Sequence, residues 1–445
     1  MSWRDHIFAL ALAAVAFLLY IATLAPSVAT IFDDSLEFPL VAHRLAIAHP
    51  TGYPLYTLII AMAARLLPVG DVAYRVNLVS ALAGAGAVGV LYLAARQLGL
   101  GRAAATWSAL VFATAETVWS QSVIAEVYAL HLLLLAALIW TTLRWGRESG
   151  GAAERGSVER RAQLPLLPAF LFGLGLAHHR ITLLWAPALA VYVWLRAPSL
   201  RRPGRAWLVL ALAAAAPLLF YLYLPLRGHA GSLDGTYSNT LPDFLCWVTA
   251  CQYQSFLTEN PLGQSRDAAF SLDLLLRQLG PLNLVLLLVG ILRQRLQPKG
   301  LFLLAGGALS AAFALAYRVA DPEVFWLPVV LTGALWTGAG LQALLDFGQR
   351  PTVDRRPPTA GGTTEDGGRR TEDGRSRPYA LRSTLYVLRF TFYAFLVLLL
   401  AASLPGWLST ARAVDRSVDW AVHDLGKDIL GQALPGDATI IGILG

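Results

Sequence analysis

Residues 7–25 carry no charged side chain, and they are enough to cross a lipid bilayer, which takes roughly 20 apolar residues. The segment is too long for a removed signal peptide and lacks a small-residue cleavage site before Pro26, so we predict a permanent first span. The composition agrees, since 56% of the residues are hydrophobic and only 14% are charged. We therefore expect an all-α polytopic membrane protein.

Further apolar segments follow the first one. They lie at about 76–95, 103–117, 126–143, 165–177, 181–195, 206–225, 281–292, 300–317, 324–345 and 385–405, so we expect about 11 transmembrane helices. Residues 54–68 are also apolar, but they are few and Arg65 interrupts them. Their length favours a juxtamembrane helix that lies at the membrane surface.

The distribution of basic residues predicts the orientation. With the N-terminus in the cytoplasm and 54–68 outside the bilayer, the inner segments hold 23 of the 35 Lys and Arg (1–6, 96–102, 144–164, 196–205, 293–299 and 347–384). A full span at 54–68 would move every later basic loop outside, against the positive-inside rule. The net charge of +7 therefore reports topology and not nucleic-acid binding. The same topology places these acids on the outer face: Asp33, Asp34, Glu37, Glu116, Glu126, Asp321 and Glu323.

The chain divides into a membrane part and two soluble segments. Residues 1–346 form the expected transmembrane catalytic region, with an acidic outer loop at 26–75 and a candidate lid loop at 226–280 that carries Trp247, Tyr253 and Phe256 on interfacial helices. Residues 347–384 have the composition of a disordered cytoplasmic linker, and 385–406 are the last span. The outer tail at 407–445 includes a predicted strand at 438–444. A lone strand is not stable without a partner. We therefore expect either that it joins another sheet or that this chain stops short of a larger outer domain.

The acidic loop presents Asp33, Asp34 and Glu37 directly after the first span. Asp34 and Glu37 are three residues apart and share a face if the segment is helical. One interpretation is a helix cap, with Asp34 as N-cap, Glu37 reaching back to the backbone and Pro39 in the first turn. The other is a carboxylate that accepts the proton of an attacking hydroxyl group. The pair supports both equally.

The next element is His49-Pro50-Thr51-Gly52-Tyr53-Pro54. Pro54 suits the first position of a following helix. The element is either a rigid corner between two interfacial helices or a binding element in which His49 donates to a phosphate or a sugar, with Tyr53 beside it. The residues favour neither interpretation over the other.

Other outer segments add candidate binding residues. Glu126 and Tyr128 lie at the mouth of a span, where an ionisable group usually faces a polar cavity, so we expect them to bind substrate. An aromatic belt is the alternative. For His178 and His179 we expect surface turn residues, with phosphate contact second, because a histidine pair alone is a weak metal signal.

Two arginines fall on the outer side, against the topological bias. Arg227 ends a span, and its guanidinium group matches a phosphate, although snorkelling to the interface is equally supported. Arg318 is a second candidate, for which a local pair with Asp321 or Glu323 is the strong alternative. Cys246 and Cys251 permit a disulfide without requiring one. We find no P-loop, Rossmann glycine pattern, nucleophile elbow or zinc signature, so ATP-driven and hydrolytic functions have no support.

Several of these motifs together resemble one family. They are Thr23-Leu24-Ala25-Pro26, Asp34-Ser35-Leu36-Glu37, His49-Pro50-Thr51-Gly52-Tyr53-Pro54-Leu55-Tyr56, Trp119-Ser120-Gln121 with Glu126-Val127-Tyr128, Tyr221-Leu222-Tyr223-Leu224-Pro225-Leu226-Arg227 and Asp321-Pro322-Glu323-Val324. They are similar to bacterial members of the TMEM260-type protein O-mannosyltransferases, which belong to the GT-C glycosyltransferases. The family usually has Gly at Leu36 and Pro at Thr51, and both departures leave the acids and His49 in place.

The resemblance implies a GT-C fold with juxtamembrane helices in the first outer loop. It also implies an inverting transfer of a sugar, mannose in this family, from a polyprenyl-phosphate donor to an acceptor hydroxyl such as a protein Ser or Thr. By motif match Asp34 is the catalytic aspartate, and the expected substrate-binding residues are Glu37, His49, Tyr53, Glu126, Tyr128, His179, Arg227 and Arg318.

No metal or other cofactor is expected, and the partners are the lipid-linked sugar, a protein or glycan acceptor and membrane lipids, without nucleic acid. We expect the chain in the plasma membrane with its active site on the outer face. The alternative function is a transporter or flippase of lipid-linked sugars, which predicts ionisable residues at the bilayer centre and discontinuous helices. This chain instead places its acids at the ends of the predicted helices.

Overall fold

The computed structural model describes residues 2–29, 33–154, 164–201, 204–263, 266–348 and 377–430. These parts of the chain form helices and loops without a β-strand, apart from one isolated bridge between Ile47 and Ser232, so the all-α prediction is confirmed. The predicted strand at 438–444 and most of the predicted linker at 347–384 lie outside the described residues.

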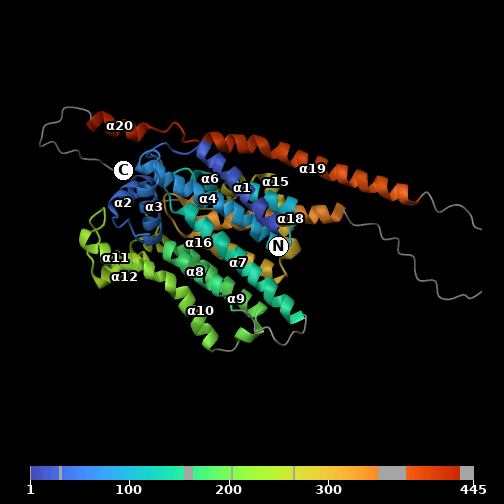
Figure 1. The fold of residues 1–445 in the computed structure, drawn as a ribbon, viewed down its shortest axis with the longest axis horizontal. Helices are drawn as coiled ribbons and strands as arrows, with labels where there is room; N and C mark the ends of the chain where they lie inside the picture. The colour runs from blue at the N-terminus through green and yellow to red at the C-terminus, as the bar shows by residue number, and fades with distance from the viewer. Residues whose placement is uncertain are drawn as a thin grey trace, which may run out of the picture.

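Long apolar helices form the centre of the molecule (Figure 1). They are α1 (Trp3–Ala22), α4 (Val72–Gln97), α5 (Arg102–Ala113), α7 (Tyr128–Glu154), α15 (Pro281–Gln294) and α18 (Leu327–Gly348). The most extensive contacts join α15 to α18, and α4 to both α1 and α7. Glycine permits the first of these: a Cβ on Gly340 would lie 1.8 Å from the carbonyl oxygen of Leu286. Small residues let membrane helices approach this closely.

A second set of helices covers one side of this bundle (Figure 1). It comprises α8 (Leu166–His178), η1 (Arg180–Trp185), α9 (Ala186–Arg196), η2 (Pro198–Arg201), α10 (Arg205–Ala215), η3 (Ala216–Leu222) and α16 (Pro298–Ala316). α8 packs against α7 and α10, and α16 packs against α9 and α18. α19 (Arg377–Val414) runs along another edge, where the rings of Trp107 and Trp407 lie 6.0 Å apart. α19 continues past the predicted end of the last span at 406, and α20 (Ala421–Leu430) follows it.

Among the described residues, seven helices are long and apolar enough to cross a membrane, or eight if α14 (Ala268–Leu279) and α15 form one span bent by 99°. The chain is thus an integral membrane protein, and the higher count of about 11 spans stays a prediction. One expected span is divided: the segment at 103–117 forms α5 and α6 (Glu116–Ser120). α8 has 13 residues, as many as the predicted segment at 165–177.

Short helices gather at one end of the bundle, at the left of Figure 1. α2 (Asp33–Arg44) and α3 (Pro54–Leu66) belong to the first loop, and α11 (Tyr223–Arg227), η4 (Gly228–Ala230), α12 (Leu241–Thr249), η5 (Cys251–Tyr253) and α13 (Ser255–Thr258) to the second. α17 (Pro322–Phe325) completes the set. α3 begins at Pro54 as predicted, and it packs against α2, α4 and α8.

Candidate active site

Asp34, Glu37 and His49 form a compact charged cluster at this end of the bundle. Asp34 and Glu37 lie on the same face of α2, and His49 lies in the loop between α2 and α3. The ring Nδ1 of His49 lies 2.5 Å from Oε2 of Glu37, and its Nε2 lies 3.7 Å from Oδ2 of Asp34. The backbone N–H of His49 also donates to Oε1 of Glu37 at 2.8 Å. Glu37 therefore positions the imidazole ring, and the ring points its other nitrogen at Asp34.

This arrangement differs from the predicted helix cap. Asp34 lies inside the first turn of α2 instead of before it, and Pro39 lies in the middle of the helix. Glu37 uses both carboxylate oxygens on His49. The capping interpretation is therefore wrong for Glu37, because a residue 12 positions along the chain occupies the oxygens that a capping box would need.

The two carboxylates control the charge of His49. Burial alone would lower the pKa of the imidazole, but the negative charges of Asp34 and Glu37 outweigh it and raise the pKa to about 9. His49 is thus a cation at neutral pH. It thus places a positive charge 3.7 Å from the carboxylate of Asp34.

Glu126 and Asp321 add a second pair of acids around Asp34. Glu126 is 1% exposed, and its Oε1 accepts from the hydroxyl of Ser35 at 3.4 Å. Burial, and then the negative charges of Asp34 and Asp321, raise the pKa of Glu126 well above its usual range. Burial and the charge of Asp34 also raise the pKa of Asp321, to about 7. These two acids are therefore suited to donate hydrogen bonds, whereas Asp34 is suited to accept one.

Aromatic and histidine rings line the interior behind these acids. Tyr53 lies edge-on to His49 with ring centroids 5.1 Å apart, and Tyr128 lies 5.5 Å from His179. His131 and His179 have centroids 4.9 Å apart. Tyr53 and Tyr128 are both 8% exposed, so the structure brings both predicted residues into the wall of the site.

The prediction of surface turn residues at His178 and His179 is wrong. Their exposed fractions are 0% and 7%, and Nε2 of His178 hydrogen-bonds the carbonyl oxygen of Val127 at 2.9 Å. The turn that ends α8 packs under α7. The two histidines are therefore buried, although polar residues in a turn are usually exposed to solvent. His131 was missed entirely. Its signal was the spacing of three residues from Tyr128, which places both on one face of α7.

Backbone carbonyls of the loop that carries His49 are held by the second outer loop. Arg227 donates to the carbonyls of Leu45 at 2.8 Å and Arg44 at 3.2 Å, and the hydroxyl of Tyr223 donates to those of Leu45 and Ala46. The N–H of Leu233 reaches the carbonyl of Ile47, and the indole N–H of Trp247 reaches that of Ala48. We call this set of contacts the carbonyl clamp. In the structure Arg227 is a positioning residue for the loop, and its phosphate role stays a prediction.

Gly52 lets the second loop come this close. Its φ is +77°, and a Cβ there would lie 2.5 Å from Cδ2 of Leu224 and 3.3 Å from Cδ1 of Trp247. Trp247 is 1% exposed, so α12 is packed on the first loop through this side chain. Trp247 is therefore a core residue and not the interfacial anchor that we expected.

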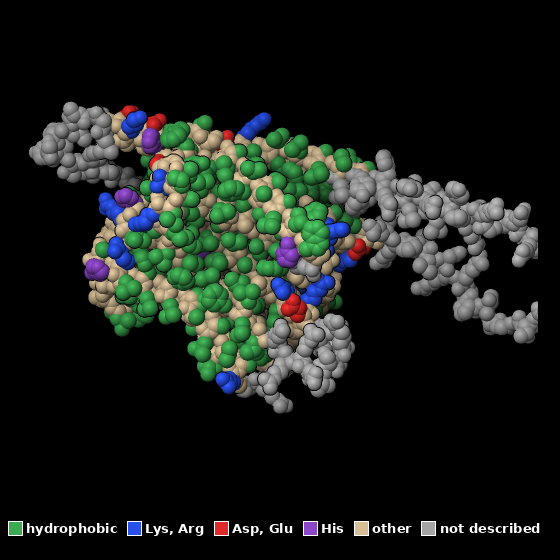
Figure 2. Space-filling view, viewed as in Figure 1, with side chains coloured by type: hydrophobic (Ala, Val, Ile, Leu, Met, Phe, Trp, Pro, Cys, Tyr) green, Lys and Arg blue, Asp and Glu red, His purple; other side chains and the backbone are tan. Residues whose placement is uncertain are grey.

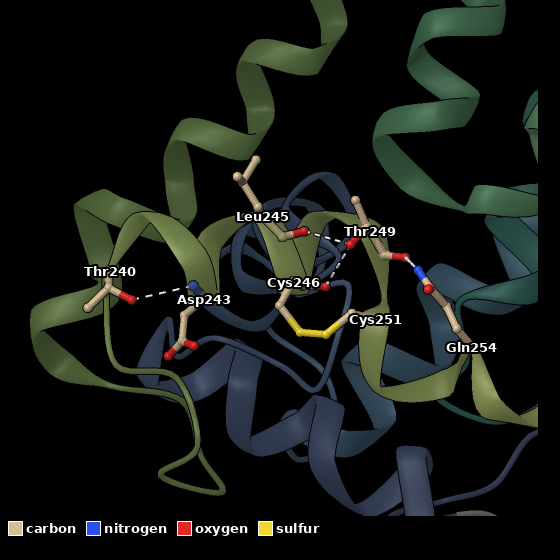
Figure 3. Close-up of a disulfide and its surroundings, with 7 residues drawn as sticks. All are labelled: Thr240, Asp243, Leu245, Cys246, Thr249, Cys251 and Gln254. Atoms are coloured by element: carbon tan, nitrogen blue, oxygen red, sulfur yellow. Dashed lines mark hydrogen bonds between the residues drawn. A yellow bond between two sulfur atoms is a disulfide. The ribbon is translucent and has the colours of Figure 1, made fainter.

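A disulfide fixes the segment after the clamp. Cys246 of α12 joins Cys251 of η5, with their Cα atoms 4.9 Å apart (Figure 3). Tyr253 ends η5, and burial, followed by the negative charges of Asp34, Glu37 and Asp234, raises the pKa of its phenol to about 12. Part of the candidate lid at 226–280 thus forms the clamp, and its role as a lid stays a prediction.

Arg318 and Arg180 differ in their surroundings. The side chain of Arg318 is exposed, and it forms no ion pair with Asp321 or Glu323, so the predicted local pair is wrong. Arg180 donates to the hydroxyl of Tyr221 at 2.9 Å, and its Nε is buried without a hydrogen-bond partner among the described residues. Arg180 therefore offers an unused donor in the interior, which the exposed Arg318 does not.

Asp34, Glu37 and His49 each offer a ligand atom, and these atoms lie within 4.8 Å of one another. Binding of a metal ion here would have to displace the proton that the raised pKa of His49 favours. A site without metal stays our prediction.

Comparison with known proteins supports the family resemblance. Residues 34–201 match the family model described as the protein O-mannosyl-transferase TMEM260 N-terminal domain. The mouse protein O-mannosyl-transferase TMEM260 is 32% identical over 236 residues, which are 52% of this chain and 33% of that protein. The Dictyostelium discoideum relative is 26% identical over 175 residues, covering 38% of this chain and 21% of that protein. The chain thus spans at most about a third of the curated relatives it matches.

Solved structures support the fold. The ArnT protein of Cupriavidus metallidurans bound to undecaprenyl phosphate aligns with a TM-score of 0.54 and 17% identity, over 76% of this chain and 60% of that one. The oligosaccharyltransferase of Archaeoglobus fulgidus aligns with a TM-score of 0.52 and 13% identity, over 94% of this chain and 57% of that one. The expected GT-C fold is confirmed.

Proposed function

We propose that this chain is an inverting glycosyltransferase that moves a sugar from a polyprenyl-phosphate donor to an acceptor hydroxyl group. The observation that carries the proposal is the charged cluster, in which Glu37 orients His49 and His49 points at Asp34. This cluster lies where the TMEM260 N-terminal domain begins. The similar ArnT structure holds undecaprenyl phosphate, which suggests the donor class for this chain.

Asp34 is the proposed catalytic base. The acceptor oxygen attacks the anomeric carbon on the side opposite the phosphate, the bond from that carbon to the phosphate oxygen breaks, and Asp34 takes the hydroxyl proton. The polyprenyl phosphate leaves with the bonding electron pair, and the configuration at the anomeric carbon inverts. A positioned base of this kind accelerates a reaction by roughly 10²–10⁴-fold.

The surrounding residues take the other roles. Glu126 and Asp321 donate hydrogen bonds to hydroxyls of the sugar or the acceptor, because their raised pKa values favour the protonated forms. Tyr53 and Tyr128 present ring surfaces to the sugar. For the phosphate we favour Arg180 over Arg227, since Arg180 keeps an unused buried donor whereas Arg227 binds two carbonyls.

Sugar, acceptor and location follow from the resemblance. Mannose and a protein Ser or Thr are proposed because the similar mouse and Dictyostelium proteins are protein O-mannosyl-transferases. The proposed location is the plasma membrane, with the N-terminus in the cytoplasm and the active site on the outer face, as the positive-inside bias indicates.

The test uses the full chain in lipid vesicles with labelled polyprenyl-phosphate-mannose and Ser/Thr-rich peptides. We expect label on the peptide and an equal amount of polyprenyl phosphate, and no transfer from a sugar nucleotide such as GDP-mannose. Vesicles without acceptor test the alternative. Lipid-linked sugar that crosses the bilayer there, with no peptide labelling when acceptor is added, would establish a flippase and overturn the proposal.

A further inference from the structure

Two adjoining cavities lie at the end of the helix bundle away from Asp34. One has a volume of about 350 Å³ and is lined by His6, Gln97, Arg144, Arg147 and Glu148. The other has a volume of about 270 Å³ and includes Arg147, Arg196 and Lys299 in its lining. Arg147 lies 19 residues after Tyr128 on α7, which corresponds to about 28 Å along a helix. The cavities are therefore about a bilayer thickness away from the acidic cluster.

Positive charge dominates the lining of both cavities. Glu148 is the acid among the lining residues, and it already pairs with Arg144 at 3.0 Å. No ion pair joins Arg147, Arg196 or Lys299 to a carboxylate in the part of the chain that the structure describes. Arg147 and Arg196 also act electrostatically on the ammonium group of Lys299. Like charges thus lie around a hollow in which, among the described residues, Glu148 is the acid and already has Arg144 as its partner.

The fold holds two of these cations in place. Arg196 donates through Nε and a terminal nitrogen to the carbonyl of Gly146, at 2.9 and 2.6 Å. The ammonium of Lys299 donates to the carbonyl of Leu98. Both contacts cross between helices, so the cations remain at the cavity wall although they repel each other. Figure 2 shows blue, purple and red side chains close together at this end of the bundle, beside the start of α1.

The positive-inside rule alone accounts for arginines in loops at this face. It does not account for cations from α7, α9 and α16 that surround a shared cavity. Nor does it account for the hydrogen bonds by which two of these cations, Arg196 and Lys299, are held to carbonyls of neighbouring helices. A phosphate group explains both features, because arginine and lysine donors match its oxygens and its charge neutralises theirs. Basic cavities between membrane helices bind phosphorylated lipid headgroups in this way.

We propose that these cavities bind a phosphate-bearing anion, with Arg147 as the cation that lines both halves of the site. The headgroup of an anionic phospholipid and a free phosphate have the same chemistry at this site. The site is separate from the sugar-transfer site and does not depend on the activity proposed above.

The test uses the purified full chain in nanodiscs of phosphatidylcholine. Thermal unfolding is followed while dihexanoyl phosphatidylglycerol, dihexanoyl phosphatidylcholine or inorganic phosphate is added. For the wild type we expect a rise in melting temperature with phosphatidylglycerol, with inorganic phosphate or with both, and none with phosphatidylcholine. A response to phosphatidylglycerol alone identifies a lipid headgroup, and a response to inorganic phosphate identifies a free anion.

Arg147→Gln should weaken binding, so that the half-saturating concentration of the anion that stabilises the wild type rises about fivefold. Arg147 is exposed and has no ion pair within the described part of the chain, so the variant should melt like the wild type without anion. The matched control is Arg205→Gln, which removes the same charge from an exposed position at the same end, outside both cavities. Equal weakening by the two variants, or no response of the wild type to either anion, would overturn the proposal.

Discussion

The two ends of the bundle treat their charges differently. At one end His49 lies between the carboxylates of Asp34 and Glu37, and the buried Glu126 and half-buried Asp321 lie near them. At the other end Arg147, Arg196 and Lys299 share a cavity, and none of them has a carboxylate partner among the described residues. The acidic end has protonation states that the fold has altered, which suits proton transfer. The basic end keeps fixed charges that a ligand can satisfy, which suits binding. Variants at each end can test this contrast.

The largest expected loss of stability comes from removing the core of the carbonyl clamp. Trp247→Ala removes a fully buried indole and its hydrogen bond to Ala48, and we expect it to lower the free energy of unfolding by about 3–5 kcal/mol. Denaturant unfolding in detergent measures the change. Trp420→Ala, at a position 42% exposed, is the control and should cost less than about 1 kcal/mol. Equal costs for both variants would show that the acidic end does not depend on the clamp.

Arg227→Gln should have a smaller effect of the same kind. The variant loses charged donors to the carbonyls of Arg44 and Leu45, so we expect a loss of about 1.5–3 kcal/mol in unfolding free energy. The Michaelis constant for the lipid donor should change little. A large rise in that constant with unchanged stability would instead assign Arg227 to the phosphate.

The charge on His49 predicts a pH dependence at the acidic end. Its pKa is about 9 in the folded chain, against about 6.5 for an ordinary histidine. The stabilisation is therefore complete below about pH 6.5 and is lost as the pH rises through about 9. Melting temperatures of the wild type and His49→Gln should converge over this range. A constant difference from pH 6 to 10 would contradict the charged state of His49.

The smallest expected effect on sugar transfer is at the basic end. Arg147→Gln should leave the rate of transfer within about twofold of the wild type, because the residue lies about 28 Å along α7 from Tyr128. Steady-state transfer in phosphatidylcholine vesicles measures it. A tenfold loss there would show that the two ends are coupled.

Local patterns in the sequence predicted much of the acidic end. The spacing of Asp34 and Glu37, the start of α3 at Pro54 and the grouping of both acids with His49 could all be inferred from a short stretch of chain. These features depend on helix periodicity and proline geometry, which act over a few residues.

Features that depend on tertiary packing could not be predicted. Glu37 has His49 as its partner and not the backbone, and Arg227 binds carbonyls more than 180 positions away in the chain. His178 and His179 are buried because the end of α8 packs under α7. Such contacts between distant parts of the chain cannot be inferred from residue type and local spacing. The cations at the basic end were predicted as topology signals, and only the fold placed them around one hollow.

The central claim is that Asp34 accepts the proton of the attacking hydroxyl group. Asp34→Asn keeps the size of the side chain and removes the base, and Asp273→Asn makes the same change at an exposed position paired with Arg277. The measurement is single-turnover transfer from labelled polyprenyl-phosphate-mannose to peptide by both variants. We predict that Asp34→Asn is slower than the wild type by about 10²–10⁴-fold, and that Asp273→Asn matches the wild type. Transfer by Asp34→Asn at the wild-type rate would contradict the account.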